Sequence, residues 1–178
     1  MGWASGSRLA GEIWDLVKDE IPESDRRSIA LGIIKAFEDM DCDTIDECEE
    51  LCRAARPVRF ASGHLDLTEG EFEEHYVPLL DAAMNERCHI VVGDAPGADT
   101  MVQRHLEKNG YERVSIFHMF FEPRNHLDKW WGTLGGFRTD EERDAAMTAA
   151  SDIDIAWVRP GRENSGTARN IKRRTKAP

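Results

Sequence analysis

The stretch 93-GDAPGAD-99 follows the apolar run 89-HIVV-92 and leads into an amphipathic run over residues 98–109. An apolar run that ends in a glycine-rich turn and continues with helical periodicity is typical of a strand, turn and helix. Glycine admits positive φ and lets backbone N–H groups approach a phosphate, and the helix that follows adds its positive end. The stretch therefore predicts a phosphate-binding turn between a strand and a helix.

The same alternation of short apolar and longer amphipathic runs fills residues 57–178. Thr68 with Glu71, and Thr139 with Glu142, have the spacing of capping boxes. Alternating strands and helices are typical of a parallel sheet, so we predict an α/β fold, a Rossmann-like parallel sheet flanked by helices. The predicted strands are 58–61, 89–92, 114–118 and 153–158, and the predicted helices are 69–85, 98–109, 140–151 and 166–174.

Residues 1–56 have a different pattern and predict a helical N-terminal appendage to the Rossmann-like domain of residues 57–178. Apolar residues recur at helical spacing over 4–20 and over 24–39. Ser24 is a suitable N-cap for the second helix, and Thr44 with Glu47 predicts a capping box that starts a third.

The acidic stretch 39–50 resembles a calcium-binding loop only in part. Asp39, Asp41, Asp43 and Glu50 stand at ligand positions of such a loop, but Thr44 replaces the glycine of its turn. We interpret the stretch as the start of a helix, and we expect neither a metal nor a cofactor.

The composition of the chain limits which kinds of binding partner it can have. The net charge of −11 argues against non-specific binding to nucleic acid or to anionic lipid. No apolar run is long enough to cross a membrane, so the cytoplasm is the expected location. The basic residues gather near the end of the chain, where Arg159 to Lys176 carries seven of them against one glutamate. This basic tail is either a solvated face or part of the binding site for an anion.

Two more turns follow predicted strands. Ser62-Gly63-His64 comes after the first strand, and Ser165-Gly166-Thr167 comes after the last. Ligands of doubly wound sheets bind outside the carboxyl ends of the strands, so we expect these turns to meet 93-GDAPGAD-99 at one site. Of the histidines, only His64 and His118 fall at strand ends, where a histidine is more often structural than catalytic.

The order of these motifs, with Arg143-Asp144-Ala145-Ala146-Met147 between the second and the last, resembles the SLOG superfamily of Rossmann-like nucleotide-binding proteins. That superfamily includes the cytokinin-activating phosphoribohydrolases and DNA-processing protein A. The resemblance covers residues 57 to about 172. In addition, 1-MGWASGS-7 and 41-DCDTIDE-47 are similar to small proteins of bacteriophage genomes.

The resemblance implies a ligand site. In it, four glycines shape a phosphate cradle, serine and threonine hydroxyls contact the ligand, and Arg143 lies beside the phosphate and ribose; an ion pair of Arg143 with Asp140 or Asp144 is the alternative. Asp94 and Asp99 would bind ribose hydroxyls or act as acid or base, unless Asp94 braces its turn and Asp99 caps the next helix. The expected ligand-binding residues are Ser62, Gly63, His64, Gly93, Asp94, Ala95, Gly97, Asp99, Arg143, Met147, Ser165, Gly166, Thr167 and Asn170.

One position departs from the phosphoribohydrolases. They carry a glutamate three residues after the threonine of the Gly-Thr pair, whereas this chain has Asn170. An amide cannot act as a base. Asn170 therefore favours binding over turnover, unless Asp94, Asp99 or Asp144 replaces the glutamate.

Residues 119–137 are predicted to form a long loop. Phe120, Phe121, Trp130 and Trp131 lie within it, and their rings could either stack a nucleobase or close an edge of the domain or a dimer interface.

Three functions are compatible with these observations. The first is the capture of a small phosphate-bearing nucleotide derivative; the resemblance to phage proteins favours a host defence signal such as an ADP-ribose derivative or a cyclic nucleotide. The second is hydrolysis of an N-glycosidic or phosphodiester bond in such a molecule. The third is a protein-interaction module that uses the N-terminal helices. Related folds commonly pair, so a homodimer is expected.

Overall fold

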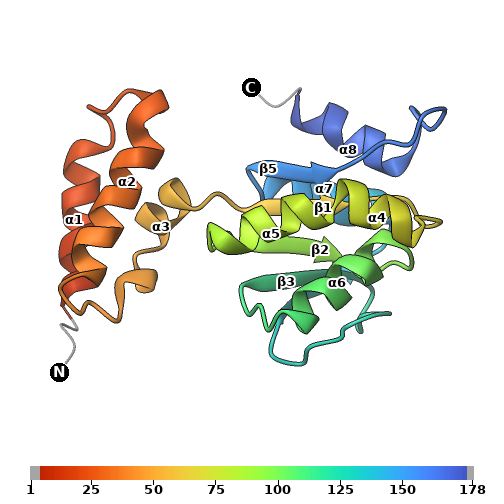
Figure 1. The fold of residues 1–178 in the computed structure, drawn as a ribbon, viewed down its shortest axis with the longest axis horizontal. Helices are drawn as coiled ribbons and strands as arrows, with labels where there is room; N and C mark the ends of the chain where they lie inside the picture. Colours follow the sequence, from red (N-terminus) through yellow and green to blue (C-terminus); the bar gives the residue numbers. More distant parts are fainter. Residues whose placement is uncertain (1–4, 176–178) are drawn as a thin grey trace. The chain divides into compact units, whose positions relative to one another are not determined.

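The computed structural model describes residues 5–175. By their internal contacts these residues form two compact units, which divide between Pro57 and Val58 (Figure 1). None of the helices in the described range is both long enough and apolar enough to cross a lipid bilayer.

The first unit is helical. It contains α1 (Gly6–Val17), α2 (Glu23–Glu38), the 3-10 turn η1 (Ile45–Glu47) and α3 (Glu49–Ala55). The apolar faces of these helices enclose a small core of their own. Trp14, Ile34 and Leu51 are the large side chains at its centre, each at most 3% exposed.

Two of the caps predicted for this unit are wrong. Pro22 occupies the N-cap position of α2, and Ser24 lies inside the helix, where its hydroxyl donates to Asp25. Proline has no side-chain acceptor that could cap the helix. Its backbone carbonyl accepts from Asp25 N at 2.9 Å and from Arg26 N at 3.2 Å, which begins the hydrogen bonds of the helix. Thr44 forms no capping bond either, because its hydroxyl donates to Ser7 Oγ at 3.2 Å instead.

The second unit is built on a sheet of five parallel strands in the order β4-β3-β2-β1-β5. The predicted α/β Rossmann-like fold is therefore confirmed. The strands are β1 (Arg59–Ser62), β2 (Ile90–Gly93), β3 (Val114–Met119), β4 (Gly132–Phe137) and β5 (Ile153–Ala156).

Helices cover both faces of this sheet (Figure 1). On one face, α4 (Glu69–His75), α5 (Val77–Asn85) and α6 (Ala98–Lys108) enclose the larger core, to which the strands contribute Ile90, Val92 and Ile116. On the other face, α7 (Asp140–Ala149) places Met147 against a second set of strand side chains, Phe60, Val91 and Phe117. Successive strand residues point to opposite faces, which explains why neighbours such as Val91 and Val92 enter different cores.

The helix α8 (Gly166–Arg174) lies beside α7 and β5. It begins with the predicted turn, since Ser165 is its N-cap and accepts a hydrogen bond from Ala168 N. Of the two boxes predicted in this unit, the one at Thr68 and Glu71 forms in full. At Thr139 only half of it forms, because Glu142 accepts from Arg138 N rather than from Thr139 N.

The prediction of an uninterrupted loop over 119–137 is wrong, because β4 occupies its last six residues. This strand is exposed along most of its length and contains three glycines. Twelve residues, 120–131, connect it to its parallel neighbour β3. A parallel pair requires a crossover of about a dozen residues or more, which is what this connection supplies, without a helix.

The strand order changes direction at β1. Its neighbours are β2 on one side and β5 on the other, so the chains leaving β1 and β5 separate at the carboxyl end of the sheet. Such a switch point opens a crevice, and it is where doubly wound sheets bind ligands. The turns after β1, β2 and β5 all lie at this edge.

Candidate functional site

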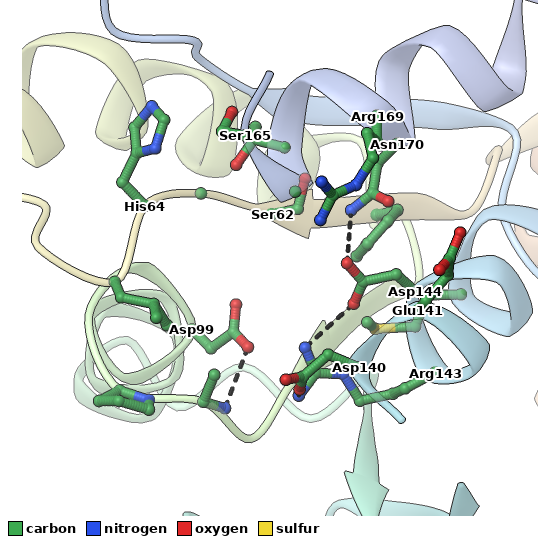
Figure 2. A pocket seen from close by; sticks show the side chains of 18 of the residues that line it. Ser62, His64, Asp99, Asp140, Glu141, Arg143, Asp144, Ser165, Arg169 and Asn170 are labelled. Carbon is green, nitrogen blue, oxygen red and sulfur yellow. Dashed lines mark hydrogen bonds and ion pairs between the residues drawn. The ribbon is translucent and has the colours of Figure 1, made fainter. Parts of the chain in front are cut away.

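A pocket of about 540 Å³ opens at the carboxyl ends of β1, β2 and β5 (Figure 2). Small-molecule sites in proteins commonly have volumes of roughly 300 to 1,000 Å³. The turn after β1, the start of α6, one side of α7 and the start of α8 form its walls. The residues that line it are Phe60, Ser62, Gly63, His64, Leu65, Asp66, Ala95, Pro96, Asp99, Arg124, Asp140, Glu141, Arg143, Asp144, Met147, Arg162, Ser165, Gly166, Thr167, Arg169, Asn170 and Arg173.

Most of the residues that the sequence predicts for the site come together here. Three do not line the pocket, namely Gly93, Asp94 and Gly97. The sequence-predicted residues that do line it are Ser62, Gly63, His64, Ala95, Asp99, Arg143, Met147, Ser165, Gly166, Thr167 and Asn170.

Asp94 does not line the pocket, but it binds two arginines that do. Its carboxylate is fully buried and accepts hydrogen bonds from Arg124 N, Nε and Nη2 at 2.9, 3.0 and 2.7 Å. Arg143 Nη1 donates to the same carboxylate at 2.9 Å. Burial alone would raise the pKa of Asp94, but the hydrogen bonds and charges of the two arginines hold it below its usual value. Asp94 is therefore an ionised structural carboxylate in this arrangement.

Arg143 links Asp94 to the pocket wall. Its Nη2 donates to Asp144 Oδ1 at 3.0 Å, and Asp144 Oδ2 accepts from Asn170 Nδ2 at 3.1 Å. The other end of the Asn170 amide accepts from Arg173 at 2.7 Å. Figure 2 shows the contacts of Asp144 with Arg143 and with Asn170. Asn170 thus joins two helices, and Asp144 is the carboxylate nearest to it.

Asp99 is the most deeply buried of the carboxyl groups that line the pocket. Its side chain is buried, and only Oδ2 has a hydrogen-bond donor among the described residues, namely Ala95 N at 3.1 Å. Burial raises the pKa of Asp99 to about 7, against the opposing charge of Arg143. The N-cap of α6 is Gly97, so Asp99 braces the turn from within the first helical turn. A carboxyl of this kind can exchange a proton near neutral pH.

Ser62 has a buried hydroxyl that lines the pocket. Ser62 is 6% exposed, and its Oγ is buried without a hydrogen bond among the described residues. The residue lies at the carboxyl end of β1 (Figure 2). An unpaired buried polar atom costs about 1 to 3 kcal/mol, so a ligand that pairs with it would recover that cost.

His64 has a bracing role in this structure. Its Nε2 accepts from Arg159 N at 3.0 Å, and its ring meets Trp157 edge on. Burial, together with the nearby charge of Arg159, lowers the pKa of His64. The neutral ring therefore ties the turn after β1 to the chain that follows β5. His118 is also buried, and its ring fills the space above Gly135.

Three of the four predicted cradle glycines are required by protein packing. A Cβ on Gly63 would lie 2.5 Å from the Tyr76 hydroxyl. Gly97 has φ +77°, and a Cβ there would meet the backbone of His64 at 2.6 Å. Gly166 differs, because the nearest atoms to its Cβ position are 3.9 Å away. Gly166 is the glycine whose open side is compatible with a close approach by a ligand.

The absence of a side chain at Gly93 leaves room for the buried side chains of Asp99 and Arg143. A Cβ at this position would overlap Asp99 Oδ2 and would lie 3.2 Å from the guanidinium carbon of Arg143. We expect Gly93→Ala to lower the free energy of unfolding by about 1 to 3 kcal/mol, because both buried side chains must move. Urea denaturation measures this loss. Gly70→Ala is the control, since its Cβ would meet nothing within 4 Å and the helix α4 should gain stability. Equal stabilities of Gly93→Ala and the wild type would contradict the proposed packing.

The basic tail contributes to the pocket. Arg162, Arg169 and Arg173 all line it. The sequence left two roles open for this segment, a solvated face or part of an anion site, and these three arginines lie at the pocket. The sequence did not predict Arg124 as a site residue, although it lines the pocket and binds the buried carboxylate of Asp94. The only signal was its place in the connection that follows a strand end.

The aromatic residues of 119–137 do not line the pocket. Phe121 and Trp130 are exposed, at 97% and 82%, whereas Trp131 is buried and its Nε1 donates to Tyr111 O. Trp131 packs in the larger core. In this structure these rings are not placed to stack a base bound in the pocket.

Comparisons with models of protein families, with curated proteins and with solved structures find no match to this chain.

Proposed function

We propose that the pocket binds a small phosphate-bearing nucleotide derivative and that the protein captures this ligand rather than converting it. The buried, unpaired hydroxyl of Ser62 carries the proposal, because it is a polar group that the protein itself leaves unsatisfied inside the pocket. The position of the pocket at the switch point of a parallel sheet supports the same conclusion.

The start of α8 supports a phosphate as the anionic part. Ser165 and Gly166 line the pocket at the helix N-terminus, where backbone N–H groups and the helix dipole favour negative charge. The resemblance of the motif order to the SLOG superfamily agrees with a nucleotide derivative. Capture rather than turnover is favoured by Asn170, whose amide is engaged at both ends and cannot act as a base.

Calorimetry with AMP, ADP-ribose and cyclic AMP tests the proposal. We expect at least one of them to bind with a dissociation constant below about 100 μM. Ser62→Ala should weaken that binding by about three- to tenfold, the value of one hydrogen bond, without lowering the stability of the free protein. If none of the three compounds binds, the proposal falls.

Ser151 offers a matched control. It is as buried as Ser62, at 6% exposure, but its hydroxyl donates to Met147 O at 2.7 Å and it lies outside the pocket. Ser151→Ala should therefore lower stability and leave binding unchanged, the reverse of Ser62→Ala. Equal effects of the two substitutions on binding would contradict a ligand contact by Ser62.

Hydrolysis of an N-glycosidic or phosphodiester bond is the second candidate, and Asp99 is the observation that favours it. A pocket carboxyl with a pKa of about 7 has the properties of a general acid. Chromatography of each compound after incubation with the protein separates the two functions. Intact ligand recovered after denaturation supports capture, and a product that Asp99→Asn fails to form supports hydrolysis.

A further inference from the structure

The pocket contains five arginines, and four of them are already engaged. Arg124 and Arg143 bind Asp94, and Arg162 donates to Asp66 at 2.9 Å. Arg173 binds the Asn170 amide and lies 3.9 Å from Glu141. The charge of each of these arginines is therefore offset by a carboxylate within the protein.

Arg169 is different. Within residues 5–175 no carboxylate oxygen lies within 4.0 Å of its guanidinium, and its hydrogen bond is a long one, from Nη1 to the backbone carbonyl of Asn164 at 3.3 Å. Its Nη2 lies 3.9 Å from the Cβ position of Gly166, at the first turn of α8. Figure 2 shows the side chain leaving α8 on the pocket side, next to Asn170.

We infer that Arg169 is the residue that pairs with the phosphate of the ligand, and that the ligand is a phosphate monoester held at the first turn of α8. This inference rests on the proposed function. A guanidinium offers several N–H donors in a fork that matches phosphate oxygens, and its charge is the one in the pocket that the protein has not offset. The open side of Gly166 leaves room for the phosphate beside it.

The unpaired atoms of the pocket wall agree with this placement. Ser62 Oγ and Arg143 Nε are both buried without partners among the described residues, and both residues face the same pocket as Arg169. On the side away from α8, Asp99 Oδ1 has no donor among the described residues, since Ala95 N donates to Oδ2, and it can accept a hydrogen bond from a sugar hydroxyl. The phosphate thus lies against α8 and the sugar lies toward α6.

A ³¹P NMR titration with ribose 5-phosphate tests the inference, because it detects millimolar binding and reports on the phosphate itself. We expect Arg169→Gln to weaken binding by roughly 10- to 100-fold, the range for hydrogen bonds between charged groups. Arg169→Lys keeps the charge but not the fork, so it should lie between Arg169→Gln and the wild type.

Arg104→Gln serves as the control. It removes one positive charge at an exposed position of α6 outside the pocket. It should change the affinity by less than about threefold. Thermal unfolding verifies that each variant is folded, which we expect because Arg169 is exposed.

The outcomes distinguish the two claims. A wild-type protein that binds ribose 5-phosphate, together with an Arg169→Gln variant that binds it equally well, overturns the inference and leaves the proposed function standing. An equal loss in Arg104→Gln also overturns it, since the effect would then be one of total charge. No response of the wild type to ribose 5-phosphate up to about 10 mM overturns the inference, whereas the proposed function falls only if AMP, ADP-ribose and cyclic AMP all fail to bind in calorimetry.

Discussion

Asp94→Asn is expected to lower the free energy of unfolding by about 3 kcal/mol, the low end of the range for breaking a buried ion pair by removing one partner. The carboxylate is fully buried and holds Arg124 and Arg143 together. Without its charge, the guanidinium of Arg143, which is 6% exposed, loses one of its compensating anions. Urea denaturation at neutral pH measures the loss.

Asp140→Asn is the matched control for this prediction. Asp140 contacts the same two arginines, at 3.5 and 3.3 Å, but its side chain is 65% exposed. Exposed ion pairs contribute about 1 kcal/mol or less, so the variant should remain close to the wild type. Similar losses in both variants would show that burial does not set the strength of these pairs.

Asp99→Asn is expected to gain stability relative to the wild type as the pH rises. The pKa of Asp99 is about 7 in the folded protein against an ordinary value of 3.8, so the folded state holds the proton more tightly. The stability that this proton contributes is fully present below pH 3.8 and is lost as the pH rises to about 7. Asparagine does not titrate and loses nothing over this range.

Between pH 5 and pH 8 the difference in unfolding free energy should shift in favour of Asp99→Asn by about 3 kcal/mol. Denaturation of both proteins at the two pH values measures this shift. A difference that stays constant with pH would contradict a raised pKa at Asp99. The stability that the ionised Asp94 contributes should be the same at both pH values, because the pKa of Asp94 is lowered.

Four of the five strands could be predicted because each is a short run of apolar residues flanked by turns, as in 89-HIVV-92. Strand β4 could not. Its sequence, 132-GTLGGF-137, has three glycines, and it is exposed at the edge of the sheet, so it lacks the apolar pattern of a buried strand. Pairing with β3 makes this segment a strand, and no local sequence pattern encodes such a contact between separate segments.

The residues of the site also divide into those that the sequence could predict and those that it could not. Ser62, Ser165 and Gly166 could be predicted because they follow strands whose carboxyl ends must meet. The partners of Asp94 could not, since Arg124 lies 30 residues away and Arg143 lies 49 residues away along the chain. The sequence therefore identified the turns that surround the pocket, but not which charges within it are already neutralised. That information decides the role of Arg169.

A crystal structure of the protein grown with AMP tests the central claim most directly. We expect density for AMP in the pocket, with its phosphate at the first turn of α8 and an oxygen within hydrogen-bonding distance of Ser62 Oγ. Density for AMP elsewhere on the surface, or an empty pocket under conditions in which calorimetry shows saturation, would contradict it.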